Sequence, residues 1–193
     1  HCLSRGLGDV YKRQVRLISM HPEFKIHSLS GETKSGLKFG EVYPSLQYLN
    51  LPNLCYVSDI NYDDLDLIFC ALPHTKSAAI INKLPRNIKI IDLSADFRLN
   101  TDSLYKKWYG VDHPCPDLLS KFIYGLTEFY RTDIKNSDYV ACTGCNSATG
   151  LYPIIPLVSE GIIEFDDIII NLATGVSGAG RKANEFIIHS EVS

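Results

Sequence analysis

The chain has 193 residues, of which 45% are hydrophobic and 21% are charged, and its net charge is -3 at pH 7. This is the composition of a globular protein with room for one domain and part of another. The slightly negative charge argues against a nucleic-acid partner. No apolar run approaches the roughly 20 residues of a membrane helix, so no membrane partner is expected. With six cysteines and no secretion signal, we expect free thiols and a cytoplasmic location.

Short apolar segments bounded by turn residues predict the secondary structure in chain order. The expected strands are residues 24–29, 66–72, 88–93, 138–142 and 167–173, and the expected helices are residues 75–84 and 147–158. Pro153 and Pro156 are expected to start, kink or break the second helix. Apolar strands that alternate with helices indicate the doubly wound α/β class, with a parallel sheet covered on both faces. Ligands of this class bind beyond the carboxyl ends of strands, so motifs that follow strands are the candidate sites.

The strongest candidate for chemistry is Cys145, in the segment ACTGCNSATG. A strand followed by Thr143 and Gly144 and then by a helix puts this thiol at a helix N-terminus, where unpaired N–H groups favour an anion. The thiolate is the nucleophilic form of cysteine. The N–H groups of Asn146 and Ser147 are suited to stabilise an oxyanion on an attacked carbonyl. The alternative is a buried structural cysteine.

Cys142 forms a C-x-x-C pattern with Cys145. Such a pattern suggests a redox pair or half of a zinc site. A zinc site needs about four ligands, and the sequence has neither a second C-x-x-C nor an H-x-x-x-H. We therefore predict no metal site and interpret Cys142 as a strand residue.

A glycine-rich segment, GVSGAGRKA, spans residues 175–183 and contains Ser177, Gly178 and Gly180 ahead of Arg181. Glycines let backbone N–H groups approach an anion or a planar ring. Arg181 is suited to pair with a carboxylate or a phosphate. A flexible turn with a solvated arginine explains the pattern equally well.

Polar residues also follow the strand at residues 88–93. The segment DLSADFRL carries Asp92, Ser94, Asp96 and Arg98, at the position where this fold class binds its ligands. Arg98 is suited to bind an acyl phosphate or a carboxylate. The alternative is a surface pair between Asp96 and Arg98.

The segment CALPHTKSA, residues 70–78, again ends a buried strand and begins a polar helix. Thr75 or His74 is suited to cap that helix. For His74, a place near a bound cofactor is favoured over the role of a proton shuttle.

Five motifs occur in the order IDLSADFRL, YKKWYG, IYGLTEFYR, TGCNSAT and GVSGAGRK. Together they resemble the N-acetyl-gamma-glutamyl-phosphate reductase family over about residues 15–193. The resemblance implies a Rossmann-like NADP-binding domain at residues 15–144 and the start of an α+β substrate domain at residues 145–193. It also implies NADPH-dependent reduction of an acyl phosphate to a semialdehyde in arginine biosynthesis, by an enzyme that is a homo-oligomer.

The same resemblance implies roles for individual residues. The Cys145 thiolate attacks the acyl carbon and expels phosphate. Arg98, Asn146 and Arg181 are the candidates for substrate contacts. The residues implied to line NADP(H) are Ser28, Ser30, Ala71, Pro73, Ser177, Gly178 and Gly180, with the two serines following the second strand to meet the adenosine 2′-phosphate. The family's general acid-base histidine has no counterpart in the sequence.

Other functions stay open on the sequence alone. A sister reductase of carrier-protein-linked glutamyl or aminoadipyl phosphate, or of aspartyl phosphate, shares the fold and the nucleophilic thiol. An inactive dinucleotide-binding remnant is a possibility from a different class. A cysteine hydrolase is disfavoured, because no Cys-His-Asn set is apparent.

The first 14 residues raise a separate question. Residues 4–14, SRGLGDVYKRQ, contain a G-x-G, but no third glycine follows and no apolar strand precedes it. The DNA of a common transposase-based sequencing adapter can encode this segment. We therefore interpret residues 1–14 as non-native, and expect a truncated chain that lacks the native first strand, its glycine-rich loop and the C-terminal part.

Overall fold

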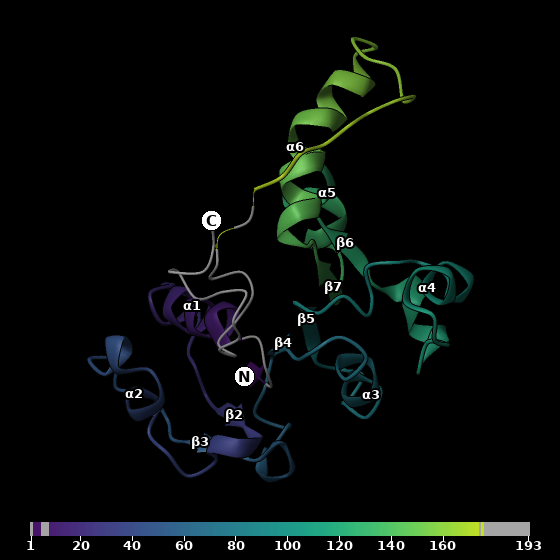
Figure 1. Ribbon diagram of the computed structural model, residues 1–193. Coiled ribbons are helices and arrows are strands. Elements are labelled where there is room, and N and C mark those ends of the chain that lie inside the picture. Colours follow the sequence, from purple (N-terminus) through teal and green to yellow (C-terminus); the bar gives the residue numbers. More distant parts are fainter. Residues whose placement is uncertain (1, 5–7, 174, 176–193) are drawn as a thin grey trace.

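The computed structural model describes residues 2–4, 8–173 and 175, and among these residues seven strands form one sheet (Figure 1). Its strand order is β3-β2-β1-β4-β5-β7-β6, and every neighbouring pair is parallel. The strands are β1 (Cys2–Ser4), β2 (Leu29–Gly31), β3 (Leu54–Cys55), β4 (Leu67–Ala71), β5 (Lys89–Asp92), β6 (Ile123–Gly125) and β7 (Tyr139–Cys142). This arrangement confirms the predicted Rossmann-like α/β fold.

Helices and short 3-10 turns connect the strands. The α-helices are α1 (Gly8–Ser19), α2 (Phe39–Val42), α3 (Ser77–Ile81), α4 (Asp102–Tyr109), α5 (Thr127–Lys135) and α6 (Cys145–Ser159). The 3-10 turns are η1 (Glu32–Lys34), η2 (Pro44–Leu46), η3 (Val57–Asp59) and η4 (Pro116–Lys121). None of the helices in the described part of the chain combines the length and the apolar character needed to cross a bilayer.

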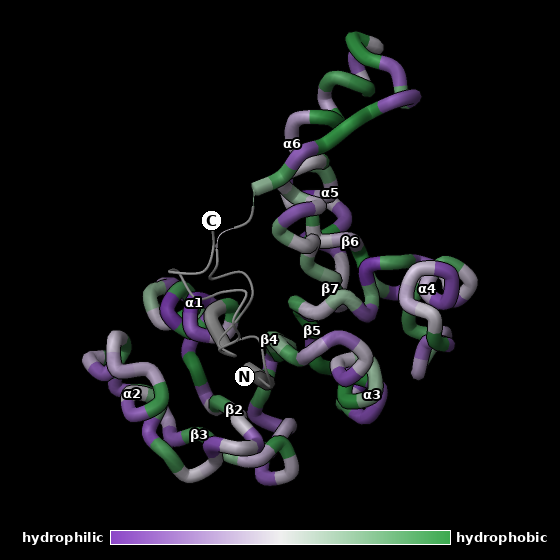
Figure 2. The backbone as a smooth tube through the Cα atoms, viewed as in Figure 1, coloured by the Kyte–Doolittle hydropathy of each residue, from purple (hydrophilic) through white to green (hydrophobic). Residues whose placement is uncertain are grey.

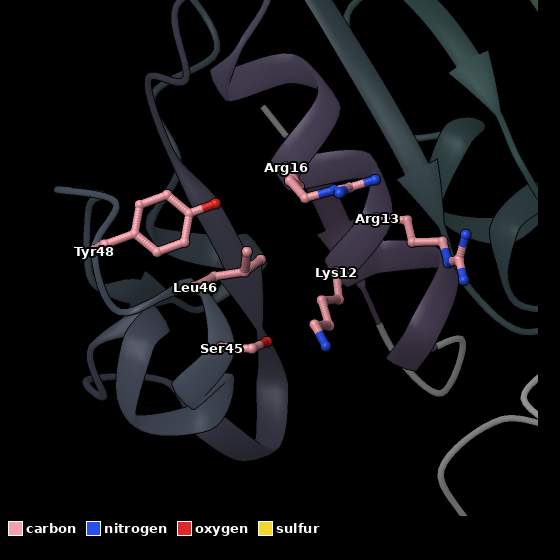
Figure 3. Close-up of a pocket in the computed structure, with 6 residues that line it drawn as sticks. All are labelled: Lys12, Arg13, Arg16, Ser45, Leu46 and Tyr48. Atoms are coloured by element: carbon pink, nitrogen blue, oxygen red, sulfur yellow. The ribbon is translucent and has the colours of Figure 1, made fainter.

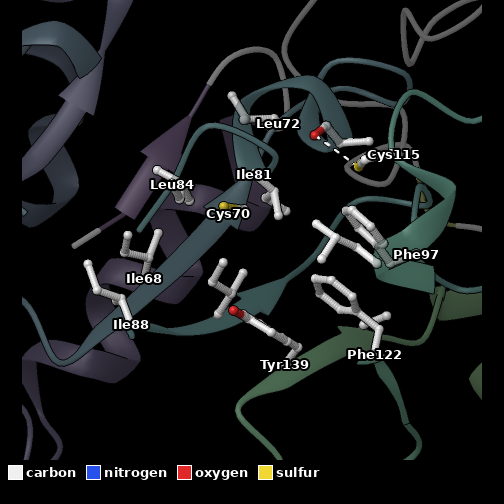
Figure 4. Close-up of a cluster of buried hydrophobic side chains, with 14 of the residues drawn as sticks. Ile68, Cys70, Leu72, Ile81, Leu84, Ile88, Phe97, Cys115, Phe122 and Tyr139 are labelled. Carbon is white, nitrogen blue, oxygen red and sulfur yellow. Dashed lines mark hydrogen bonds between the residues drawn. The ribbon is translucent and has the colours of Figure 1, made fainter. Parts of the chain in front are cut away.

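Strand β4 shows why a continuous apolar run becomes a central strand. Successive side chains of a strand point to opposite faces of the sheet. Ile68 and Cys70 enter the apolar cluster on one face, drawn in Figure 4, whereas Phe69 and Ala71 enter the cluster on the other face. Because both faces of β4 are covered, an apolar residue is favourable at every position, and burying a large one contributes about 1.5–3 kcal/mol.

The two clusters also explain where the helices lie. Tyr11, Val15 and Ile18 follow helical spacing on α1 and pack in the cluster with Phe69. In Figure 2, hydrophobic and hydrophilic positions accordingly alternate along α1. Helix α3 contributes Ala78 and Ile81 to the opposite cluster. The sheet is therefore covered from both sides, as the pattern of strands and helices predicts.

Two predicted strands differ from the structure. The strand expected at residues 24–29 forms only from Leu29, which is fully buried, while Phe24 is 44% exposed. Residues 167–173 form no strand, and Ile169 is 84% exposed. A strand needs a neighbour for its backbone N–H and C=O groups, and none of the strands in the described residues pairs with this segment. The prolines at 153 and 156 do not interrupt α6, which contains both of them.

The beginning of the sheet also differs from expectation. We expect the native first strand to be missing, yet β1 occupies the central position between β2 and β4. Helix α1 runs without a break through position 15, where the native sequence is expected to begin. Strand pairing uses backbone groups, which any extended segment supplies. The foreign origin of residues 1–14 therefore stays a prediction.

Candidate functional site

Cys145 is the first residue of α6 and follows the carboxyl end of β7 after two residues. Gly144 is the N-cap, with an extended backbone at φ -77° and ψ 152°, and its carbonyl accepts the first helical bond from the N–H of Ala148 at 2.8 Å. The Cys145 side chain is exposed, and its Sγ lies 3.8 Å from Oδ1 of Asn146. The thiol thus lies at a helix N-terminus, where first-turn N–H groups have no intrahelical acceptor.

Arg98 links the ends of β5 and β7 beside the residues 143–144 that precede Cys145. Its Nε donates to the carbonyl of Cys142 at 2.7 Å, and its Nη2 donates to the carbonyl of Leu93 at 3.1 Å. A Cβ atom placed on Gly144 would lie only 3.0 Å from Nη1 of Arg98. Glycine at position 144 therefore lets the guanidinium pack against the turn before the cysteine.

Strands β6 and β7 also approach each other closely beside the turn. A Cβ atom on Gly125 would lie 2.9 Å from the Cα of Cys142 and 3.0 Å from the carbonyl oxygen of Ala141. The first distance is shorter than real Cβ atoms show and the second is unusually tight, so a side chain at position 125 would force the backbone to shift. Gly125 thus permits the close strand packing on which the Cys142–Gly144 turn rests.

The second cysteine of the C-x-x-C pattern lies in a different environment. Burial and, to a smaller extent, nearby Asp92 raise the pKa of Cys142 to about 11, although Arg98 opposes both. Its thiol is therefore protonated at neutral pH. Cys142 and Cys145 are both free thiols, half-buried and exposed respectively. In the described part of the chain, no group of three His, Cys, Asp or Glu residues is placed to hold a metal ion.

A buried carboxylate lies at the end of β5. Asp92 is fully buried and accepts hydrogen bonds from the hydroxyls of Ser77, at 2.7 Å, and Ser94, at 2.6 Å. The backbone N–H of Ser94 donates to it as well, at 3.1 Å. Burial nevertheless dominates, so the pKa of Asp92 is raised to about 6 even though these hydrogen bonds favour the charged form.

A second buried carboxylate, Asp96, holds the loop between β4 and α3. It accepts hydrogen bonds from the N–H groups of Thr75, at 2.7 Å, and Ala78, at 2.9 Å. Nδ1 of His74 lies 2.7 Å from its Oδ1, and the hydroxyl of Tyr105 donates at 3.4 Å. Thr75 has a left-handed backbone, with φ 68°, which these bonds stabilise. The alternative of a surface pair between Asp96 and Arg98 is thus wrong, because Asp96 is fully buried.

His113 supports the same network from the α4 side. Its Nδ1 accepts from the N–H of Cys115 at 3.1 Å, so its Nε2, 3.0 Å from the carbonyl oxygen of Asp96, carries the proton and donates. Burial lowers the pKa of His113. The ring is therefore a neutral, structural histidine.

The predicted cofactor residues fall into three groups. Ala71 ends β4 and is fully buried, and Pro73 follows it half-buried. Both lie at the carboxyl end of β4, next to β1, where the strand order reverses and this fold binds dinucleotides. Ser177, Gly178 and Gly180, together with the predicted substrate residue Arg181, lie outside the described residues.

The third group, Ser28 and Ser30, is placed differently from the prediction. The second strand begins at Leu29, so Ser28 precedes it and Ser30 is buried inside it, at 1% exposure. The prediction that both serines follow the strand is wrong, because the strand starts later than its apolar pattern indicates. The segment Glu32–Lys34 instead occupies the strand end, and the Glu32 carboxylate accepts a hydrogen bond from the N–H of Val57 at 3.2 Å.

A basic cavity of about 450 Å³ lies elsewhere, between α1 and η2 (Figure 3). Its lining residues are Lys12, Arg13, Arg16, Ser45, Leu46 and Tyr48. The elements that form it carry none of the predicted site residues. It is therefore not part of the candidate site around Cys145.

Comparison with known proteins gives matches along the chain. Residues 8–137 match the model of the semialdehyde dehydrogenase NAD binding domain, and residues 145–193 match the model of the semialdehyde dehydrogenase dimerisation domain. The second match begins at Cys145.

Several relatives are named N-acetyl-gamma-glutamyl-phosphate reductase. The protein of Cereibacter sphaeroides (strain ATCC 17025) is 51% identical over 179 residues, and that of Rhodobacter capsulatus is 49% identical over 178 residues. The alignments cover 93% and 92% of this chain and 52% of each relative. The protein of Paracoccus denitrificans is 48% identical over 179 residues. The chain thus spans about half the length of the curated relatives that it matches.

Proposed function

Because the chain belongs to the semialdehyde dehydrogenase family, we propose that it takes part in the NADPH-dependent reduction of N-acetyl-gamma-glutamyl phosphate to N-acetylglutamate semialdehyde, with Cys145 as the nucleophile. The observation that carries this proposal is the exposed thiol at the first position of α6. The names of the relatives support the choice of substrate and the assignment to arginine biosynthesis.

The proposed reaction begins with Cys145 at the N-terminus of α6, and the thiolate is the nucleophilic form of its side chain. Its sulfur forms a bond to the acyl carbon of the substrate, and the bond from that carbon to the phosphate oxygen breaks. Inorganic phosphate leaves, and the acyl group remains on Cys145 as a thioester. The backbone N–H groups of Asn146 and Ser147, in the first turn of α6, are the proposed donors to the oxyanion that develops during attack.

Arg98 is the proposed contact for the anionic end of the substrate. Two of its nitrogens already bind backbone carbonyls, which fixes the plane of the guanidinium at the turn. The hydrogens of Nη1 are the donors that face Gly144 and are proposed to reach the substrate. The Asn146 side chain, beside the thiol, and Arg181 complete the proposed substrate contacts.

When bound, NADPH supplies the hydride that reduces the thioester to the aldehyde. The described residues fit such a cofactor at the carboxyl end of β4, where Pro73 and the exposed Thr75 form a loop that Asp96 fixes from below. At the end of β2, the exposed Thr33 and Lys34 are the proposed contacts for the 2′-phosphate, in place of Ser28 and Ser30. Ser177, Gly178 and Gly180 are proposed to line the nicotinamide side.

We also propose that the protein acts as a homo-oligomer. The segment that follows α6 exposes large apolar side chains, among them Ile162 at 67%, Phe165 at 79% and Ile169 at 84%. Exposed apolar side chains in such number indicate a surface that is covered in the working protein. The match of residues 145–193 to a dimerisation domain supports another protomer as the cover.

The function is tested by turnover of the complete gene product with NADPH and N-acetyl-gamma-glutamyl phosphate. We expect Cys145→Ser to reduce turnover by about 10⁴-fold or more, because the nucleophile is lost, and the matched control Cys142→Ser to retain most activity. Aspartyl phosphate and carrier-linked glutamyl phosphate serve as competing substrates. Faster turnover of either competing substrate would indicate a sister reductase. NADPH binding without turnover of any of these substrates would indicate an inactive dinucleotide-binding module.

A further inference from the structure

The turn before Cys145 is held by a hydrogen-bonded relay that starts in a neighbouring strand. The hydroxyl of Tyr124, in β6, lies 2.7 Å from Oγ1 of Thr143. Oγ1 of Thr143 in turn donates to the carbonyl of Gly144 at 3.3 Å. A hydroxyl has a single proton to donate. Since Thr143 gives its proton to Gly144, the Tyr124 hydroxyl must be the donor to Thr143, and the relay runs from Tyr124 to Gly144.

The end of this relay is the N-cap of α6. The Gly144 carbonyl accepts the first helical hydrogen bond from Ala148 at 2.8 Å as well as the bond from Thr143. The Gly144 carbonyl is therefore bound both by a residue of α6 and by a residue that precedes the helix. Because Cys145 is the next residue, the orientation of this peptide sets the direction of its side chain and of the first-turn N–H groups around its sulfur.

Arg98 holds the same segment from the opposite side. It binds the Cys142 carbonyl at 2.7 Å and packs against Gly144. The Cys142–Gly144 segment thus lies between a cation that follows β5 and a hydroxyl from β6. Arg98 binds the carbonyl at the start of the segment, whereas the Thr143 side chain binds the Gly144 carbonyl at its end.

We propose that Tyr124 is a positioning residue for Cys145, and that its hydroxyl acts through Thr143 to fix the Gly144 peptide and hold the thiol at the N-terminus of α6. The inference rests on the proposed role of Cys145, but it predicts a property of the thiol that can be measured without turnover. The Tyr124 ring also packs edge-to-face against Tyr130, with centroids 6.5 Å apart. That contact persists when only the hydroxyl is removed.

The experiment measures the rate at which iodoacetamide alkylates Cys145 at pH 7 in the chain, followed by mass spectrometry of its peptide. Tyr124→Phe and Thr143→Val remove one hydroxyl each at nearly constant shape. We expect each to slow alkylation of Cys145 by about 3- to 10-fold, the effect of one net hydrogen bond. Thr143→Ser, which keeps the hydroxyl, is expected to restore the rate to within about 2-fold of the parent. The double variant is expected to be no slower than either single variant, because both interrupt one relay.

The outcomes separate this inference from a general loss of structure and from the proposed reaction. Equal rates in all variants, additive slowing in the double variant, or a Thr143→Ser rate as low as that of Thr143→Val would each overturn it. If Tyr124→Phe does not fold, the two Thr143 variants alone decide the matter. Alkylation of Cys145 can be slowed equally in the single and double variants of a chain that forms no acyl adduct with the substrate. That result would support the positioning role of Tyr124 and would contradict the reaction assigned to Cys145.

Discussion

Two neighbouring regions at the carboxyl edge of the sheet use their polar groups in opposite ways. Around Asp96, the carboxylate is fully buried and each of its oxygens accepts hydrogen bonds from the protein. Around Cys145, the sulfur is exposed, and it makes a long contact of 3.8 Å with Oδ1 of Asn146. Buried polar groups with complete sets of partners stabilise a fold, whereas an exposed reactive group on a fixed turn is available for a ligand. The difference supports the proposal that the Asp96 region holds the fold together and that the Cys145 turn carries the reaction.

Replacing one group in each region tests whether the two regions contribute differently to the stability of the fold. Asp96→Asn puts an amide N–H₂ against the N–H of either Thr75 or Ala78, so one buried donor loses its acceptor. We expect a loss of about 3 kcal/mol in the free energy of unfolding, measured by urea denaturation. Cys145→Ser should change it by less than about 0.5 kcal/mol. Comparable losses in the two variants would show that both regions are structural.

The pH dependence of stability tests the burial of Asp92. Its pKa in the fold, about 6, lies above the ordinary value of 3.8, so the folded protein binds more protons than the unfolded chain between these values. The cost of burying its charge is therefore absent below about pH 4, grows as the pH rises, and is complete above about pH 6. As the pH rises from 4 to 7, we expect the free energy of unfolding of the Asp92→Asn variant to increase by about 2–3 kcal/mol relative to that of the parent. Parallel stability curves for the two proteins would contradict the assignment.

A smaller effect is expected from the packing beneath the reactive turn. Gly125→Ala forces a methyl group against the backbone of Cys142, and we expect it to cost about 1–2 kcal/mol in stability. Gly31→Ala is the matched control on β2, because a Cβ atom there would meet nothing closer than 3.5 Å. Its cost should stay below about 0.5 kcal/mol. Equal costs in thermal or urea unfolding would mean that the close approach of β6 to β7 is not required.

Much of this arrangement could be predicted from the sequence. Strands β4, β5 and β7 are buried runs bounded by turn residues, and the small residues before Cys145 predict the end of a strand and the start of a helix. Strand β2 could not be placed as well, because its three residues carry too short a pattern to fix their register. The segment at 167–173 has the apolar pattern of a strand, but its partner decides whether a strand forms.

The side-chain partners within the site were less predictable. Asp96 and Arg98 are two residues apart and of opposite charge, which suggests a surface pair, yet the fold carries one toward the β4 loop and the other toward Cys142. The contact between Tyr124 and Thr143 joins a residue of β6 to the residue that follows β7, 19 positions away. No local sequence pattern predicts such a contact. Once the strand order is known, however, the register of β6 against β7 places Tyr124 near Thr143.

The most direct test of the account is to map where the acyl group goes. The chain is mixed with N-acetyl-gamma-glutamyl phosphate in the absence of NADPH, quenched in acid, and digested for mass spectrometry. We predict an N-acetylglutamyl adduct on the peptide that contains Cys145, located on that residue by fragmentation, and its disappearance in the Cys145→Ser variant. An adduct on Cys142 instead, or no adduct on a chain whose Cys145 still reacts rapidly with iodoacetamide, would contradict the account.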